Sequence, residues 1–329
     1  MKVLFIGGTG QISTACARLA VERGMDVHAL LRGRTSTRPL PEGVQPIRGD
    51  IRDAAGARAA LGDHEWDAVV DWIAFTPDHV QADLDLFEGR TGQYVFISSA
   101  SAYQTPPQRL PVVESTPLRN PIWGYSRAKI ACEDLLVAAH RERGLPMTIV
   151  RPSHTYDHTQ VPFDGGWTVV ERMRRGAPVV VHGDGTSLWT LTHHTDFAKA
   201  FVGLLGAPQA IGEAFQITSD EWLSWNQIYA AIASAAGAEP EYVHVPSDAI
   251  AAADPDWGAA LLGDKAHSMV FDNAKVKALV PDYVATVPFA QGAREIVAWY
   301  DGDPARRVVD ERMDGLMDRL AEAYRPRGL

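Results

Sequence analysis

The sequence predicts an α/β protein in which a doubly wound parallel sheet is followed by a smaller α/β region. Through the first 150 residues, short apolar runs rich in β-favouring residues alternate with segments of helical periodicity. This alternation indicates βαβ units with right-handed crossovers. Beyond residue 152 the alternation loosens, and proline and glycine interrupt the chain more often. We therefore expect the parallel sheet in residues 1–152, with returning segments near residues 190–220, and the smaller region in residues 153–329.

The first expected elements are a strand over residues 3–6, a glycine-rich turn and a helix over residues 12–24. Gly7 allows a tight turn, and Gly10 lets backbone N–H groups approach a pyrophosphate at the helix N-terminus. The third small position of the motif is Ser13, which still permits close packing of helix and strand. In this strand–turn–helix context a dinucleotide site is favoured over a purely structural turn. The cofactor-binding residues expected here are Gly7, Thr9, Gly10, Gln11 and Ile12.

The remaining elements are read from periodicity and from breaker residues. Further strands are expected over residues 27–31, 45–48, 68–73, 93–97 and 147–150, with helices over residues 54–61, 77–87 and 128–143. The last of these helices is ended by Gly144 and Pro146. In the second half we expect strands over residues 179–181, 215–217 and 242–245, and helices over residues 167–175, 196–205, 225–236, 288–300 and 307–324.

Composition and charge disfavour several classes of function. The formal net charge of −10 disfavours nonspecific attraction to nucleic acid or to an anionic membrane. No segment approaches the roughly 20 apolar residues that span a bilayer. We do not expect a signal peptide, because the first expected strand starts at residue 3 and runs straight into the glycine turn. Cys16 and Cys132 are the only cysteines and occupy apolar helical positions, so neither a disulfide framework nor a thiol metal site is expected. We expect a cytoplasmic protein.

A metal site is not expected either. His193 and His194 are the pair most easily mistaken for metal ligands. Adjacent residues on a strand face opposite sides, and neither a cysteine nor an acidic pair completes a ligand set.

Two stretches carry residues suited to proton and hydride transfer. The strand that ends at Ile97 leads into a serine cluster up to Tyr103, and ligands of such sheets bind at the carboxyl ends of strands. Tyr125 and Lys129 are four residues apart and share one helical face. Free tyrosine has a pKa of about 10, and a nearby lysine would favour its phenolate and could hold a nicotinamide ribose. Such a pair is common on surfaces, but its place after the serine cluster favours an active site.

Together these motifs resemble an extended short-chain dehydrogenase/reductase of the NAD-dependent epimerase/dehydratase superfamily. The likeness covers nearly the whole chain and implies a Rossmann fold whose second region caps the substrate. It rests on Gly7-Gly-Thr-Gly10, Gly49-Asp-Ile-Arg-Asp53, Ser98-Ser99 with Tyr103, Tyr125 with Lys129, Arg151-Pro152, His193-His-Thr-Asp196 and Asp272-Asn-Ala-Lys275.

The resemblance also implies roles for individual residues. Ser99 matches the catalytic serine or threonine, Tyr125 the acid/base, and Lys129 its partner. Asp50 matches the acidic residue that contacts adenine, with Ile51 alongside, although a simple turn role is the alternative for Asp50.

One departure from the family pattern bears on the cofactor. Many NAD-preferring members end the second strand with an acid for the ribose hydroxyls, whereas this chain has Leu31 there, followed by Arg32 and Arg34. A guanidinium can clamp a 2′-phosphate. NADP(H) is therefore favoured over NAD(H), which stays open because both arginines could simply be solvated.

Other departures bear on the substrate. Ala100-Ser101 replaces the Asp-Glu pair of sugar 4,6-dehydratases, and Trp189 replaces an arginine that grips the diphosphate of nucleotide sugars. An indole cannot neutralise a diphosphate, so we expect neither activity on a nucleotide-linked sugar nor dehydration. The substrate-facing residues expected are Ser101, His154, Tyr156 and Trp189, with a polar loop or core packing as the alternative.

The predicted function is an NAD(P)-dependent oxidoreductase or epimerase that acts on a secondary alcohol or ketone of a sugar-like small molecule. Epimerase and reductase remain alternatives, because the hydride either returns to the same molecule or leaves with the product. The chain also resembles the chloroplast stem-loop RNA-binding branch of the superfamily, so an RNA-binding or cofactor-sensing relative is a further alternative. The intact Ser99, Tyr125 and Lys129 favour an enzyme. The resemblance also allows a homodimer.

Overall fold

A seven-stranded parallel sheet forms the first part of the molecule. The computed structural model describes residues 1–33 and 38–325. The strands run in the order β11-β6-β5-β4-β1-β2-β3, and every neighbouring pair is parallel. They are β1 (Lys2–Ile6), β2 (Asp26–Leu31), β3 (Gln45–Arg48), β4 (Ala68–Asp71), β5 (Tyr94–Ile97), β6 (Met147–Pro152) and β11 (Glu213–Ile217). This confirms the predicted fold class.

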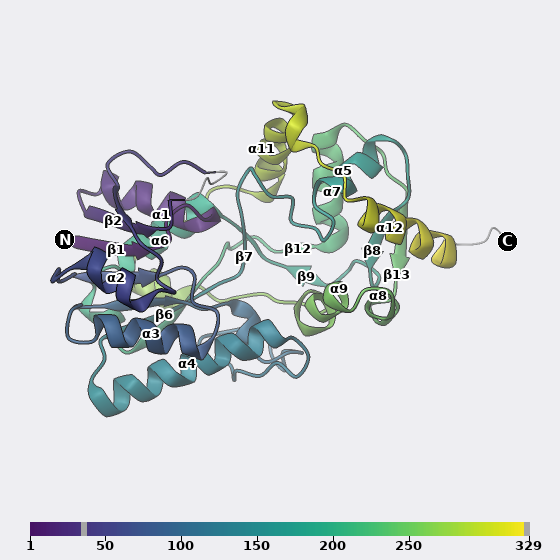
Figure 1. The fold of residues 1–329 in the computed structure, drawn as a ribbon. Helices are drawn as coiled ribbons and strands as arrows, with labels where there is room; N and C mark the ends of the chain where they lie inside the picture. The colour runs from purple at the N-terminus through teal and green to yellow at the C-terminus, as the bar shows by residue number, and fades with distance from the viewer. Residues whose placement is uncertain (34–37, 326–329) are drawn as a thin grey trace.

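Helices cover both faces of the sheet (Figure 1). One face carries α1 (Gln11–Glu22) and α6 (His194–Leu204), and the other carries α2 (Ala54–Leu61), α3 (Pro77–Phe87) and α4 (Gly124–Arg143). Successive β1 side chains therefore enter different cores: Val3 and Phe5 pack with α1 and α6, while Leu4 and Ile6 pack on the α3 side. A strand buried on both faces must be apolar at every position, which explains the continuous apolar run at the N-terminus.

The second part of the molecule is a smaller lobe, on the right in Figure 1. Its strands β8 (Val179–His182) and β13 (Tyr242–Val245) pair in parallel. Its helices are α5 (Trp167–Arg174), α7 (Trp225–Ala236), α8 (Ser247–Ala253), α9 (Pro255–Ala260), α11 (Phe289–Asp301) and α12 (Glu311–Tyr324), and a π-helical turn at Leu261–Lys265 follows α9. Aromatic stacking contributes to its core, where the rings of Phe163 and Tyr229 lie 4.0 Å apart.

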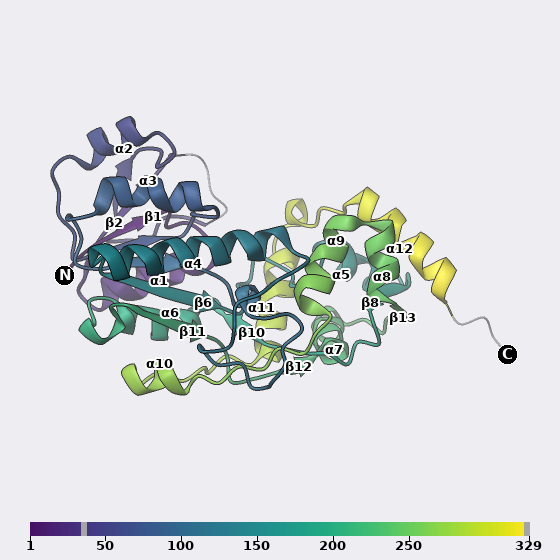
Figure 2. The same cartoon turned by 90° about the horizontal axis from the view of Figure 1, so that it is seen from below.

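Short strand pairs lie between the two parts, near the middle of Figure 1. β7 (His154–Tyr156) pairs with β10 (Leu191–His193), and β9 (Leu188–Trp189) pairs with β12 (Leu223–Ser224). In Figure 2, α4 runs along the sheet and one of its ends lies beside α9. The two parts therefore meet near the carboxyl ends of β5 and β6 and the first turn of α4.

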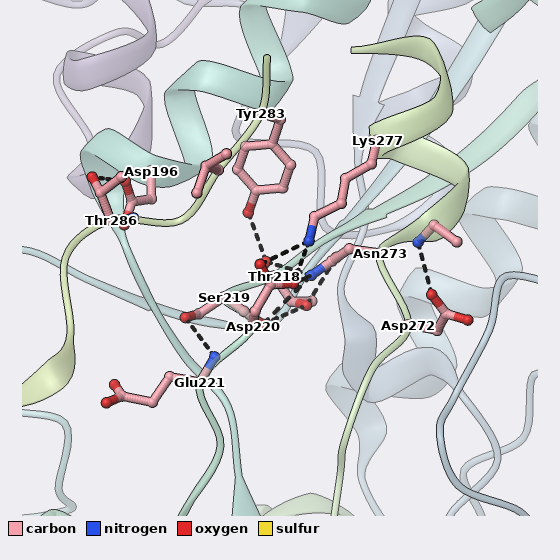
Figure 3. A network of polar contacts seen from close by, with 12 residues as sticks. Asp196, Thr218, Ser219, Asp220, Glu221, Asp272, Asn273, Lys277, Tyr283 and Thr286 are labelled. Atoms are coloured by element: carbon pink, nitrogen blue, oxygen red, sulfur yellow. Dashed lines mark hydrogen bonds and ion pairs between the residues drawn. The ribbon is translucent and has the colours of Figure 1, made fainter. Parts of the chain in front are cut away.

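Two motifs on which the resemblance rests fasten the chain after β11 (Figure 3). Asn273, just before α10 (Ala274–Leu279), donates to the carbonyl oxygen of Thr218 at 2.8 Å and to Asp220 at 3.0 Å. The carboxylate of Asp196 accepts the backbone N–H groups of Thr286 and Val287 at 2.9 and 2.8 Å. The Asp272–Lys275 motif therefore holds the segment that follows β11, and the His193–Asp196 motif holds the segment that precedes α11.

The expected elements agree with the structure except at particular boundaries. α4 begins at Gly124 rather than at residue 128, which places Tyr125 and Lys129 in one helix. The strand expected to reach residue 73 ends at Asp71, because the Asp71 carboxylate accepts the N–H groups of Ile73 and Ala74 and turns the chain.

The argument that placed His193 and His194 on opposite faces of one strand was wrong. His193 ends β10 and His194 begins α6, so the two rings lie in contact with centroids 4.5 Å apart. Within residues 1–33 and 38–325, no helix is both long and apolar enough to cross a membrane.

Candidate active site

The glycine-rich turn opens into a groove at the carboxyl ends of β1, β2 and β3. The groove has a volume of about 520 Å³. Six residues expected to bind the cofactor line it, namely Gly7, Thr9, Gly10, Arg32, Asp50 and Ile51. The fold thus gathers residues from three strand ends into one elongated site, where parallel α/β sheets bind their ligands.

The turn itself fits a pyrophosphate. Gly7 adopts a φ of +84°, and a Cβ there would approach Cγ2 of Ile73 to 3.2 Å, so only glycine suits the position. Gly10 is the N-cap of α1 and has no side chain that could accept the first-turn N–H groups. Those donors and the positive end of the helix dipole form an anion-binding set. The donor chemistry therefore fits a dinucleotide.

The other expected cofactor residues differ in position. Asp50 lines the groove but also accepts the backbone N–H of Arg52 at 3.0 Å, so it serves its turn as well. Ile12 packs against the apolar core beside β1 instead of lining the groove. Gln11 lies at a second cavity, where it donates to Gln160 at 3.0 Å. Arg34 lies outside the described residues.

The second cavity lies between the two parts of the molecule and has a volume of about 310 Å³. Its lining includes five of the predicted functional residues, namely Ser99, Ser101, Tyr125, His154 and Trp189. They come from the end of β5, the start of α4, β7 and β9. Tyr156, also expected here, is instead buried in the core, with its ring 5.3 Å from that of Phe289 on α11.

Ser99 and Tyr125 lie near one another in the wall of this cavity. The Ser99 hydroxyl forms a hydrogen bond of 2.9 Å with the Ser101 hydroxyl. Burial raises the pKa of Tyr125, the nearby Ser99 hydroxyl lowers it, and the charge of Asp264 raises it, with a net increase. Tyr125 therefore keeps its proton near neutrality in this structure.

Lys129 lies beneath this pair and is 2% exposed. Its Nζ donates to the carbonyl oxygens of Ala74 and Ile97, both at 2.7 Å, and lies 5.9 Å from the centroid of the Tyr125 ring. Burial lowers the pKa of Lys129 to about 8. The sequence analysis expected Lys129 to favour the phenolate of Tyr125 and so to lower its pKa. The structure shows a raised pKa instead, because burial dominates and the Lys129 ammonium is held by two carbonyl oxygens.

His154 and Trp189 form a pair on the opposite wall. The indole N–H of Trp189 donates to Nδ1 of His154 at 3.2 Å. Burial lowers the pKa of His154 to about 3, so the ring is neutral at physiological pH. Because an indole nitrogen can only donate, Nδ1 is the acceptor and the ring proton lies on Nε2.

Three residues that line or brace the site were missed by the sequence analysis. Asp264, in the π-helical turn, lines the cavity, and burial raises its pKa to about 7. Asn120 donates to the carbonyl oxygens of Ser101 at 3.2 Å and Gly263 at 2.6 Å, which ties the serine cluster to that turn. Arg38 forms an ion pair with Asp157 across the two parts. A π-bulge often marks a functional site. Neither a π-bulge nor a contact between distant residues produces a repeating pattern in the sequence, so the sequence analysis could not find these residues.

Sequence comparison identifies the family. The profile of the NAD dependent epimerase/dehydratase family matches residues 3–218. The chain belongs to this family. It is thus an extended short-chain dehydrogenase/reductase, as the glycine-rich, serine and tyrosine–lysine motifs indicated.

Individual family members with curated functions are distant. The chain is similar to the chloroplast stem-loop binding protein of 41 kDa b from Arabidopsis thaliana, with 27% identity over 74% of this chain and 65% of that protein, so it spans about two thirds of that relative. It is also similar to 2′-dehydrokanamycin reductase from Streptomyces kanamyceticus, with 27% identity over 86% of this chain and 80% of that one.

Solved structures of family members agree in fold. An epimerase from Methanothermobacter thermautotrophicus superposes with a TM-score of 0.75 at 17% identity, over 93% of this chain and 94% of that one. The NAD complex of UDP-glucose 4-epimerase from Thermus thermophilus gives 0.73 at 24% identity, over 92% and 99% of the two chains. At such identities the likeness concerns the fold alone.

Proposed function

We propose that this protein is an NAD(P)-dependent oxidoreductase or epimerase that acts on a secondary alcohol or ketone of a sugar-like small molecule. The observation that carries the proposal is that Ser99 and Tyr125 line the same cavity of about 310 Å³. That cavity lies at the carboxyl ends of β5 and β6, in the same sheet whose strands β1, β2 and β3 end at the groove. When bound, the nicotinamide would supply or accept the hydride.

Tyr125 would carry the proton. Its raised pKa keeps the phenol protonated near neutrality, and this form donates to a carbonyl oxygen that is being reduced. The Ser99 hydroxyl, which lines the same cavity, would orient the same oxygen. A protonated Tyr125 supports the reductive direction, whereas an epimerase would also need the phenol to take a proton back.

Lys129 would act on the cofactor side. The carbonyls of Ala74 and Ile97 engage two of the three N–H donors of its ammonium. We propose that the third donor holds a ribose hydroxyl and that the positive charge assists Tyr125 once the nicotinamide is bound.

The cavity supports a small substrate without a nucleotide. Its volume lies at the lower end of the roughly 300–1,000 Å³ typical of ligand pockets. Its walls offer the Nε2 donor of His154, the carboxyl of Asp264 and the faces of Trp123 and Trp189. Lys265 is the cation in this lining, and it lies 4.0 Å from the carboxylate of Asp164, which offsets its charge. A neutral polyhydroxylated ketone suits this set better than a diphosphate.

NADP(H) is the cofactor we propose, with NAD(H) as the alternative outcome of the test. Leu31 and Arg32 both line the groove. The end of β2 therefore offers no carboxylate for the ribose hydroxyls, and the next residue offers a guanidinium that could bind a 2′-phosphate. A cytoplasmic location and a homodimer remain predictions from the sequence.

The proposal is tested with purified protein, keto-sugars without a nucleotide, and both reduced cofactors. We expect NADPH-dependent reduction, and we expect Tyr125→Phe to lower kcat by roughly 100-fold or more while the cofactor Kd measured by nicotinamide fluorescence stays unchanged. Full activity in Tyr125→Phe would contradict the assignment. Epimerisation with tightly bound NAD would instead favour the epimerase.

Stem-loop binding is the second candidate, because of the similarity to the chloroplast protein. The net charge of −10 argues against it. If it were the function, affinity for a stem-loop RNA would fall steeply with salt concentration and would survive the Tyr125→Phe substitution.

A further inference from the structure

Two fully buried carboxyl groups lie together below Lys129, Asp71 at the end of β4 and Asp83 in α3. Oδ1 of Asp71 accepts the backbone N–H groups of Ile73 at 2.5 Å and Ala74 at 2.8 Å. Oδ2 of Asp83 accepts the hydroxyl of Tyr94 at 2.7 Å. Each carboxyl group therefore uses one oxygen for a fixed protein donor.

Within residues 1–33 and 38–325, the other two oxygens are left without a partner. Oδ2 of Asp71 and Oδ1 of Asp83 are buried, and neither has a donor among the described residues. The two side chains are within hydrogen-bonding distance of one another. Two adjacent carboxylates in an apolar site cannot both be ionised, so one of them must carry a proton.

The proton belongs on Asp83. Two backbone N–H bonds stabilise the charged form of Asp71, while Asp83 accepts a single hydroxyl. Burial, followed by the charge of Asp71, raises the pKa of Asp83 well above its usual range. A protonated Asp83 then donates to Oδ2 of Asp71, and both unpartnered oxygens are satisfied.

Asp71 is connected to Lys129 in two ways. It binds the N–H of Ala74, whose carbonyl oxygen accepts the Lys129 ammonium at 2.7 Å. Its negative charge also opposes the effect of burial on the pKa of Lys129. Asp71 therefore holds the acceptor of Lys129 in place and helps to keep the lysine charged.

We propose that Asp71 and Asp83 share one proton, that Asp83 carries it, and that the resulting single negative charge on Asp71 makes Asp71 a positioning residue for Lys129. The role of Lys129 rests on the proposed function, whereas the shared proton does not. The charged and titratable groups around the pair are Arg52 after β3, His79 on α3, Tyr94 on β5, and Lys129, Cys132 and Glu133 on α4.

The shared proton is tested by infrared spectroscopy of the full-length protein. At about pH 9, Asp264 with its pKa of about 7 is ionised, so a protonated-carboxyl band arises from Asp83. We expect this band in the wild type and its loss in Asp83→Asn. Absence of the band in the wild type, or its persistence in Asp83→Asn, would overturn the proposal. This result does not depend on any enzymatic activity.

The effect on Lys129 is tested by the pH dependence of turnover. Asp83→Asn replaces one neutral group by another that can still donate to Asp71 and accept from Tyr94, so the alkaline limb should keep its position. In Asp71→Asn the charge moves to Asp83, and Lys129 loses its proton at lower pH. The alkaline limb should then move down by about one pH unit.

Coincident profiles for Asp71→Asn and the wild type, or an equal shift in Asp83→Asn, would refute the positioning role. If Asp71→Asn does not fold, Asp83→Asn remains informative, because a shift of its alkaline limb would show that Asp83 is ionised in the wild type. If no turnover is found with any ketone, the proposed function fails while the infrared result still stands.

Discussion

The indole N–H of Trp189 donates to Nδ1 of His154, 3.2 Å away and 35 residues earlier in the chain. This contact fixes the ring proton on Nε2, because burial keeps the imidazole neutral and the indole can only donate. His154 is thus a hydrogen-bond donor whose tautomer is set by Trp189.

Trp189→Phe should therefore weaken substrate binding and leave the chemical step intact. Phenylalanine retains an aromatic wall but removes the donor, and the loss of about 1 kcal/mol corresponds to a rise in KM of roughly five-fold. Steady-state kinetics measures this, and nitrogen NMR of His154 should show a mixture of tautomers. His154→Gln, which keeps a donor near the position of Nε2, is the control and should retain most of the affinity. An unchanged KM and a single tautomer in Trp189→Phe would contradict the prediction.

Asp264 should set a pH dependence near neutrality. Below its pKa of about 7 the carboxyl group is neutral, and above it the negative charge raises the pKa of Tyr125 and makes the phenol a weaker acid. We expect kcat for ketone reduction to fall as the pH rises through 7, and we expect Asp264→Asn to remove this step from the pH–rate profile. A step that persists in Asp264→Asn would have to come from another group.

The same carboxyl group should make folding less stable as the pH rises. Its folded-state pKa of about 7 lies above the unfolded value of about 3.9, so the folded state binds more protons in this interval and stability falls from about pH 4 to 7. Asp264→Asn should raise the free energy of unfolding at pH 8 by on the order of 2 kcal/mol, with little change at pH 4. Urea unfolding at the two pH values measures the difference, and equal effects at both would contradict it.

Arg32→Ala should weaken NADPH binding selectively. A charge-assisted hydrogen bond to a phosphate contributes about 1.5–3 kcal/mol, so the Kd for NADPH should rise by about ten-fold or more while that for NADH stays constant. Arg23→Ala, an exposed arginine at the far end of α1, is the matched control. Equal weakening of both cofactors would show that Arg32 does not discriminate between them.

Gly7→Ala should impair cofactor binding as well as stability. The position has a φ of +84°, and a Cβ would press on Ile73 at 3.2 Å. Gly24→Ala is a matched control, because Gly24 has a φ of +78° but nothing lies within 4 Å of the point that a Cβ would occupy. Both variants should lose about 1 kcal/mol of stability, but only Gly7→Ala should raise the cofactor Kd. A normal Kd in Gly7→Ala would remove the turn from the site.

The sequence was most informative where a local pattern reports burial. Strands covered on both faces must be apolar throughout, so β1 and the other central strands could be recognised from single segments. The Gly7–Gly10 turn and the Tyr125–Lys129 spacing are local too, and they led to the family that the comparison confirms. The strands β7, β9, β10 and β12 were missed because two or three residues are too few to show a period.

Sequence alone determined the sheet, the glycine-rich turn and most of the helix that carries Lys129, since each depends on residues close together in the chain. Only the tertiary structure decided which polar groups meet. Asn120 contacts Gly263 across 143 residues, and Tyr156 lies in the core because α11 covers its end of β7. Burial likewise shifts the pKa values of His154, Asp264 and Asp83. Desolvation depends on everything packed around a group, and no local pattern records it.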